Sequence, residues 1–346
     1  MAAPIRLIST DFDGTIFAEF EQPPVPRALQ AALAAFQARG ARWVINTGRD
    51  LSSLMEALGR AHLEVRPDYL VLVERELYRH DGVRYVGMED WNRRCEADHA
   101  ELFARVRPEV PRLTAWIRER FDAMVYEDAF SPFCLIAEAN GDADVICAYL
   151  EEVCREIPGL SVVRNDVYAR FSHRGYSKGT ALAELTRQLG LDAAHVFAAG
   201  DHYNDLPMLD RRVAHRLVCP ANAIAAVKRQ VTVQGGEVSP LLHGFAVAAA
   251  LEGVPGRWRG SVPQIDTCGI ARGSPAQGQV VGRVPRRLRP ARLTRPARGS
   301  SQAGVPPGGI PARNGESRSS GEGEARAMAS ERIFLERTGS SGCSLP

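Results

Sequence analysis

Long hydrophobic runs are absent from this chain of 346 residues, and we expect no leader of an exported protein. No apolar stretch approaches the roughly 20 residues that a transmembrane helix needs. The first residues lack a charged segment followed by an apolar core and a small-residue cleavage site, and they lead directly into a strand-like run. We therefore expect a cytoplasmic protein without a membrane partner.

Paired cysteines are also missing. The seven cysteines are scattered along the chain and none forms a Cys-x-x-Cys pair, so the sequence indicates neither a zinc site nor a disulfide framework. We expect reduced thiols, as in cytosolic proteins. Lysine is almost absent, because only Lys178 and Lys228 occur, and a lysine within a motif is therefore informative.

The net charge of +2 conceals two parts of opposite sign. Residues 256–346 contain 15 Arg, no Lys and 6 acidic residues, which gives +9, whereas the first 255 residues carry −7. From about residue 254 the composition turns to Arg, Pro, Gly and Ser, which cannot bury enough apolar surface to offset the entropy of ordering. We predict a disordered low-complexity tail over residues 254–346. A nucleic-acid-binding arm is the alternative, but the tail lacks the interleaved aromatic residues of a stacking platform.

The most informative stretch is an apolar run, residues 5–8, that leads into Asp11, Asp13 and Gly14. Such a run is typical of a short buried strand. Two carboxylates one residue apart repel each other unless a cation or a proton lies between them. At the carboxyl end of a parallel strand, where open α/β sheets bind ligands, the pair predicts a metal-assisted catalytic site. The alternative is a solvated Asp-Gly turn.

Strand and helix patterns alternate on both sides of a central interruption. The elements predicted around it are strand 5–8, helix 27–39, strand 43–45, helix 51–59 and strand 69–73, then helix 178–189, strands 195–199 and 213–218, and helices 221–230 and 240–251. This alternation predicts an α/β fold with a doubly wound parallel sheet.

The interruption has a different rhythm. Asp81-Gly82 between two strand-like runs predicts a hairpin, and a charged helical segment over 89–121 follows it. Further strand-like runs surround a predicted helix over 142–156, which indicates a small α+β domain. We therefore expect a core formed by residues 1–74 and 174–253, and an inserted domain over residues 75–173.

Three further clusters of polar residues lie at strand ends or at a helix start. Thr47-Gly48 follows the second strand and precedes a helix, where a hydroxyl and exposed amides suit a phosphate group. Lys178 begins a helix, a position that the helix dipole makes unfavourable for a cation unless an anion is near. Asn204 lies between Asp201 and Asp205 after a later strand. The plain alternatives are a surface lysine at Lys178 and a helix cap at Asp201.

Together these clusters resemble the four motifs of the haloacid dehalogenase superfamily. The matching stretches are Asp11-Phe12-Asp13-Gly14-Thr15, Thr47 in Asn-Thr-Gly-Arg, Lys178 in Ser-Lys-Gly-Thr, and Gly200-Asp201-His202-Tyr203-Asn204-Asp205, the last resembling the Cof-type branch. The resemblance covers residues 1 to about 253. It implies a Rossmann-like core, with the insert over 75–173 as a cap of the C2 type, because that branch carries its cap between motifs two and three.

The resemblance implies a Mg²⁺-dependent phosphatase that acts on a small phosphorylated metabolite. Asp11 would be the nucleophile that forms an aspartyl-phosphate, and Asp13 the general acid and base. Thr47, Gly48 and Lys178 would bind the phosphate group.

The implied metal ligands and substrate contacts overlap with these motifs. The ligands of Mg²⁺ would be Asp11, the backbone carbonyl of Asp13, and Asp201, with Asp205 in support. Arg49 and Asn204 are candidate substrate contacts. A salt bridge is the alternative for Arg49.

One stretch departs from the Cof pattern. Members of that branch often carry an Asn-Gly-Ala-like turn after the third strand, where this chain has Val73-Glu74-Arg75-Glu76-Leu77. Pro67-Asp68-Tyr69 and Asp90-Trp91 are similar to the sucrose-phosphate-phosphatase-like branch, which implies a sugar phosphate as the substrate. Two other functions stay open: a sugar phosphomutase with a C2 cap, and a binding or regulatory protein that uses the basic tail.

Overall fold

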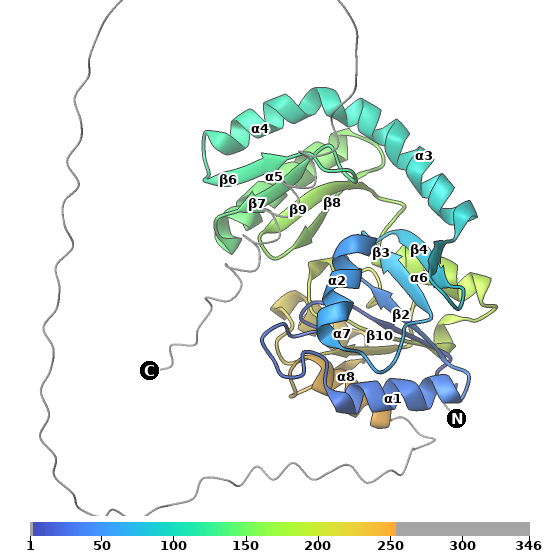
Figure 1. Ribbon diagram of the computed structural model, residues 1–346. Coiled ribbons are helices and arrows are strands. Elements are labelled where there is room, and N and C mark those ends of the chain that lie inside the picture. Colours follow the sequence, from blue (N-terminus) through green and yellow to red (C-terminus); the bar gives the residue numbers. More distant parts are fainter. Residues whose placement is uncertain (1–2, 254–346) are drawn as a thin grey trace, which may run out of the picture. The chain divides into compact units, whose positions relative to one another are not determined.

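The structure, a computed structural model, describes residues 3–253 (Figure 1). The predicted disordered tail, residues 254–346, lies outside the described residues. Within the described part, one sheet has eight strands in the order β12-β11-β10-β1-β2-β3-β4-β5, and a second has four in the order β6-β7-β9-β8. We call them the large and the small sheet.

Six neighbouring strands of the large sheet are parallel, as predicted. In sheet order they are β12 (Glu237–Val238), β11 (Arg216–Cys219), β10 (Val196–Ala199), β1 (Leu7–Thr10), β2 (Arg42–Asn46) and β3 (Tyr69–Leu72). Strand β12 is not predicted by the sequence pattern, because its two residues carry no apolar periodicity, and both are exposed.

Helices cover both faces of the large sheet, which confirms the doubly wound arrangement. Successive strand residues point to opposite faces. Ile8 packs in the same buried cluster as residues of α1 (Arg27–Ala38), α2 (Leu51–Ala61) and α8 (His243–Glu252). Leu7 packs in another cluster with residues of α6 (Lys178–Gln188) and α7 (Ala225–Val233). Both faces are therefore apolar, as expected for a central parallel strand.

The predicted hairpin forms, but it belongs to the large sheet. Strands β4 (Glu76–His80) and β5 (Tyr85–Gly87) are antiparallel, and β4 pairs with β3. Asp81 fixes the turn, because its Oδ1 accepts the backbone N–H groups of Val83 and Arg84. The hairpin thus extends the sheet of the core rather than the sheet of the insert predicted from residue 75. The division into core and inserted domain itself stays a prediction.

The small sheet is antiparallel and packs against three helices. Its strands are β6 (Ala123–Tyr126), β7 (Cys134–Ala137), β9 (Tyr168–His173) and β8 (Leu160–Asn165). The helices are α3 (Glu89–Val106), α4 (Val110–Arg118) and α5 (Asn140–Glu156), with a 3-10 turn between the first two. Leu113, Leu135, Leu150 and Phe171 lie in its buried core. Among residues 3–253, no helix combines the length and the apolar character needed to cross a bilayer.

His99 is a buried titratable group in this part of the fold. It lies on α3 with 4% of its surface exposed. Its Nε2 accepts the backbone N–H of His173 at 3.1 Å, so the neutral ring carries its proton on Nδ1, which donates to the carbonyl of Cys95 at 2.7 Å. Burial lowers the pKa of His99 to about 3, and the charge of Arg75 acts in the same direction.

We expect this histidine to make the fold sensitive to acid. Below the ordinary histidine pKa of about 6.5, His99 binds a proton in the unfolded chain but not in the folded one. The free energy of unfolding therefore decreases as the pH is lowered. The loss is up to about 1.4 kcal/mol per pH unit between about 6.5 and 3. Urea unfolding on both sides of pH ~6.5 measures it. His99→Gln should flatten this dependence, whereas the control His195→Gln should not; an unchanged dependence in His99→Gln contradicts the assignment.

Candidate active site

The predicted site residues meet at one edge of the large sheet. Strands β10, β1 and β2 are neighbours and run parallel, so their carboxyl ends lie side by side. Asp201 follows β10, Asp11 follows β1 and Thr47 follows β2. This is the edge at which open α/β sheets bind ligands.

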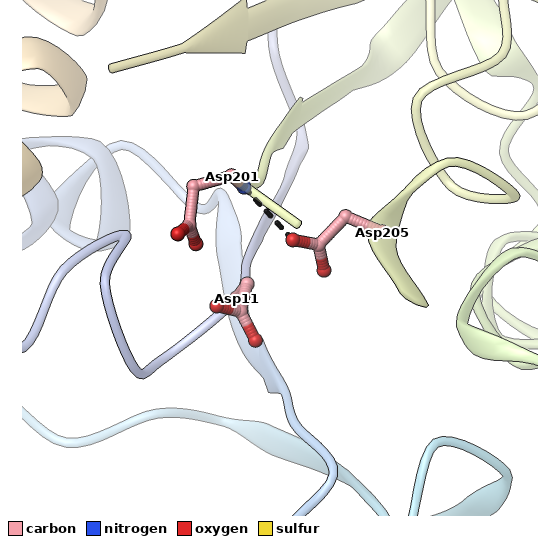
Figure 2. Close-up of side chains that lie close together, drawn as sticks. All are labelled: Asp11, Asp201 and Asp205. Atoms are coloured by element: carbon pink, nitrogen blue, oxygen red, sulfur yellow. Dashed lines mark hydrogen bonds between the residues drawn. The ribbon is translucent and has the colours of Figure 1, made fainter. Parts of the chain in front are cut away.

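Three carboxylates converge at this edge. Asp11, Asp201 and Asp205 are buried, and each offers an oxygen within 4.8 Å of the others (Figure 2). Asp205 Oδ2 accepts the backbone N–H groups of Asp201 at 2.8 Å and His202 at 2.9 Å. Burial raises the pKa of Asp11 to about 7, and the charge of Asp205 adds to this effect while Lys178 opposes it. Burial and the charges of Asp11 and Asp205 hold the pKa of Asp201 well above its ordinary value.

Lys178 is the cation of this cluster. It is the first residue of α6, follows the N-cap Ser177 and has 0% of its surface exposed. Its Nζ donates to Asp11 Oδ1 at 2.5 Å and to Asp205 Oδ1 at 2.7 Å. Desolvation alone would lower the pKa of Lys178, but Asp11 and Asp205 outweigh it and keep the ammonium charged. The alternative of a surface lysine is therefore wrong.

Asp13 lies apart from these three carboxylates and pairs with Arg49. Arg49 Nε and Nη2 donate to the two oxygens of Asp13, each at 2.8 Å. Arg49 precedes α2, whose N-cap Asp50 accepts the backbone N–H of Ser53. The structure thus shows the salt-bridge alternative for Arg49. Thr47 is buried beside it, and its Oγ1 accepts the Arg49 backbone N–H at 3.2 Å.

The carboxylate cluster fits a hard divalent cation. Carboxylate oxygens are the ligands that Mg²⁺ prefers, and a cation would offset the repulsion that raises the pKa values of Asp11 and Asp201. The backbone leaves room for it: Gly14 has φ +76°, and a Cβ there would lie 2.5 Å from Asp201 Oδ2. Thr15 Oγ1 holds the other Asp201 oxygen at 2.6 Å. Both Asp205 oxygens are engaged by Lys178 and backbone amides, so Asp205 supports the site.

Two site residues were not predicted from the sequence. Glu74 Oε1 accepts from Asn204 Nδ2 at 3.0 Å, and Oε2 accepts from Arg170 Nη2 at 2.9 Å. Glu74 and Arg170 have only 5% and 3% of their surface exposed. The departure from the Cof turn at Val73-Glu74 was the only sequence signal for this pair. Arg170 lies in β9 of the small sheet, and no local pattern marked it.

Comparisons with known proteins find related sequences and a shared fold. Residues 119–239 match the family model of the haloacid dehalogenase-like hydrolases. The stress response protein YhaX of Bacillus subtilis (strain 168) is 30% identical over 110 residues, which are 32% of this chain and 36% of YhaX. YxeH of the same organism, provisionally named a phosphatase, is 24% identical over 255 residues, 66% of this chain and 92% of YxeH.

A solved structure shares the fold. The sucrose-phosphatase of Synechocystis sp. PCC6803, determined with sucrose and phosphate, has a TM-score of 0.55 and 19% identity, covering 72% of this chain and 97% of that one. This likeness concerns the fold alone. The family match covers residues 119–239, and together with the parallel sheet and the four motifs at its edge it supports the resemblance of this chain to the haloacid dehalogenase-like hydrolases. The match to YhaX spans about a third of that relative.

Proposed function

We propose that this hydrolase is a Mg²⁺-dependent phosphomonoesterase that cleaves a small phosphorylated metabolite, a sugar phosphate, through an aspartyl-phosphate at Asp11. The observation that carries the proposal is the pairing of buried Lys178 with Asp11 inside a cluster of three carboxylates. The provisional name of YxeH and the sucrose-phosphatase fold support a phosphate ester as the substrate.

The first chemical step uses Asp11 and Lys178. A carboxylate oxygen of Asp11 attacks phosphorus, and the bond from phosphorus to the ester oxygen breaks. Lys178 offsets negative charge on Asp11 and on the transferring phosphoryl group. Thr47 and the amide of Gly48 hold phosphate oxygens at the end of β2.

Asp13 acts as the general acid and then as the general base. It gives a proton to the leaving oxygen, and then takes one from the water that hydrolyses the aspartyl-phosphate. Its bidentate pairing with Arg49 fixes the orientation of the carboxylate, and the substrate must loosen this pairing when the leaving oxygen approaches.

The carboxylate cluster provides the metal site. Asp11, Asp201 and the backbone carbonyl of Asp13 would hold Mg²⁺, with Asp205 positioning Lys178 and the backbone of Asp201. When bound, Mg²⁺ offsets the repulsion between the Asp11 carboxylate and the phosphate dianion.

Removal of the metal tests this function directly. We expect excess EDTA to abolish hydrolysis of p-nitrophenyl phosphate and added Mg²⁺ to restore it. Asp201→Asn should raise the Mg²⁺ concentration for half-maximal activity by about tenfold or more, because it weakens one ligand. The matched control is Asp210→Asn, since Asp210 lies in the same loop but pairs with Arg212. Full activity in EDTA, or equal Mg²⁺ dependence of both variants, contradicts the metal site.

A further inference from the structure

The turn between β3 and β4 has a backbone that its residues do not favour. The Arg75 N–H closes it on the Leu72 carbonyl at 2.9 Å, and the two central residues, Val73 and Glu74, have φ of 44° and 67°. Positive φ at both central positions is usual for Gly, Asn or Asp, and it is an outlier for a β-branched residue. The conformation persists because surrounding contacts hold it, and such strain gathers at functional sites.

Backbone and side-chain hydrogen bonds hold the turn. The backbone N–H groups of Val73 and Glu74 donate to the carbonyls of Arg49 at 3.0 Å and Thr47 at 2.9 Å, and the Glu74 side chain makes further contacts. The Glu74 carboxylate accepts hydrogen bonds from Asn204, in the loop after β10, and from Arg170, in β9 of the small sheet. Arg170 Nη2 also donates to the Val73 carbonyl at 2.8 Å. A Cβ on Gly48 would lie 3.3 Å from Glu74 Oε1, so the carboxylate borders the expected phosphate cradle. Burial alone would raise the pKa of Glu74, but Arg170 and Lys178 lower it and keep the group ionised.

The two partners of Glu74 have spare hydrogen-bonding capacity. Arg170 Nε and Asn204 Oδ1 are buried, and neither has a hydrogen-bond partner within residues 3–253. Arg170 Nε is a donor, whereas Asn204 Oδ1 is an acceptor. A hydroxyl group both donates and accepts, so adjacent hydroxyls can satisfy both atoms and the remaining lone pairs of Glu74.

We propose that Glu74, Arg170 and Asn204 bind the leaving group of the substrate and select phosphorylated polyols against esters that carry a second anion. This inference rests on the proposed function, because it places the leaving group beside the phosphate cradle. Glu74 accepts hydroxyl protons, and Arg170 Nε donates to a hydroxyl oxygen. The negative charge of Glu74 beside Gly48 repels a carboxylate on the leaving group.

The test uses two ligands that differ by one group. Glycerol 3-phosphate has a hydroxymethyl group where 3-phosphoglycerate has a carboxylate. Each is measured as a competitor of p-nitrophenyl phosphate hydrolysis, so a Ki is obtained whether or not the competitor is itself cleaved. We expect the wild type to bind glycerol 3-phosphate at least about tenfold more tightly, in the range that one mispaired polar contact produces.

Glu74→Gln removes the charge of the side chain and keeps its shape. It should reduce the ratio of the Ki of 3-phosphoglycerate to the Ki of glycerol 3-phosphate by about fivefold or more. Glu74→Gly should reduce the same ratio of Ki values. Because glycine adopts a positive φ without strain, this second variant keeps the test valid if Glu74→Gln fails to fold. The matched control is Glu76→Gln, because Glu76 lies two residues along and bonds Tyr78 instead of the site. Equal Ki values in the wild type, or a ratio that Glu74→Gln and Glu74→Gly leave unchanged, overturn the inference. A wild type that does not hydrolyse p-nitrophenyl phosphate refutes the proposed function instead.

Discussion

Replacing Asp11 with Asn should lower turnover of p-nitrophenyl phosphate by roughly 10³-fold or more, because an amide cannot form the covalent intermediate. The fold should survive. The amide oxygen of the introduced asparagine would still accept a hydrogen bond from Lys178 Nζ, and Lys178 would keep its ion pair with Asp205. The change also removes a buried carboxyl whose pKa is raised to about 7, so one source of repulsion in the cluster is lost.

Steady-state kinetics with Mg²⁺ and thermal unfolding check both parts of this expectation. The control is Asp192→Asn, because Asp192 caps the turn at Ala193–His195 and lies outside the site. If Asp11→Asn keeps activity within about tenfold of the wild type while the fold is intact, Asp11 is not the nucleophile.

Lys178→Met should damage both stability and catalysis. The substitution leaves Asp11 and Asp205 without the cation that both contact. Breaking a buried ion pair by removing one partner costs about 3–5 kcal/mol, because an uncompensated charge stays behind. Turnover should fall by at least about 10²-fold, since charge on the transferring phosphoryl group loses its fixed counter-charge.

The chain offers a matched control for this variant. Lys228 is the other lysine of the sequence, and its Nζ donates to the carbonyl of Ala221. Lys228→Met should cost about 1 kcal/mol and leave turnover unchanged, because a single hydrogen bond is lost. Urea unfolding and kcat measured on both variants decide the matter. Similar losses of stability in the two would show that Lys178 does not neutralise the buried carboxylates.

The large sheet and the motif residues could be predicted because their signals are local. A buried parallel strand is a short apolar run, and Asp11, Thr47 and Asp201 each follow such a run closely. Once the strands are parallel neighbours, their carboxyl ends must meet. Lys178 was identifiable because lysine is rare in this chain and because a helix start is an unusual place for a cation.

The features that were missed depend on contacts between distant parts of the chain. The hairpin at Asp81-Gly82 was predicted, but which sheet it joins depends on the pairing of β4 with β3. Glu74 and Arg170 are 96 positions apart, and neither has a pattern of its own. The turn at Val73-Glu74 contradicts local preferences, so propensity could not predict its positive φ. Its departure from the Cof pattern nevertheless marked the place where the unpredicted contacts lie.

The most direct test of the account is to trap the phosphorylated enzyme. In Asp13→Asn, the leaving group of p-nitrophenyl phosphate still departs as p-nitrophenolate without a proton donor, but the water that hydrolyses the intermediate lacks its base. Acid quenching during turnover with p-nitrophenyl phosphate, followed by trypsin and mass spectrometry, examines the peptide of residues 7–27, in which Asp11 is then the only aspartate. We expect one phosphoryl group on Asp11, and none when Asp11→Asn is added. Sustained hydrolysis with no phosphoryl group on this peptide, or with the group on another residue, would contradict covalent catalysis by Asp11.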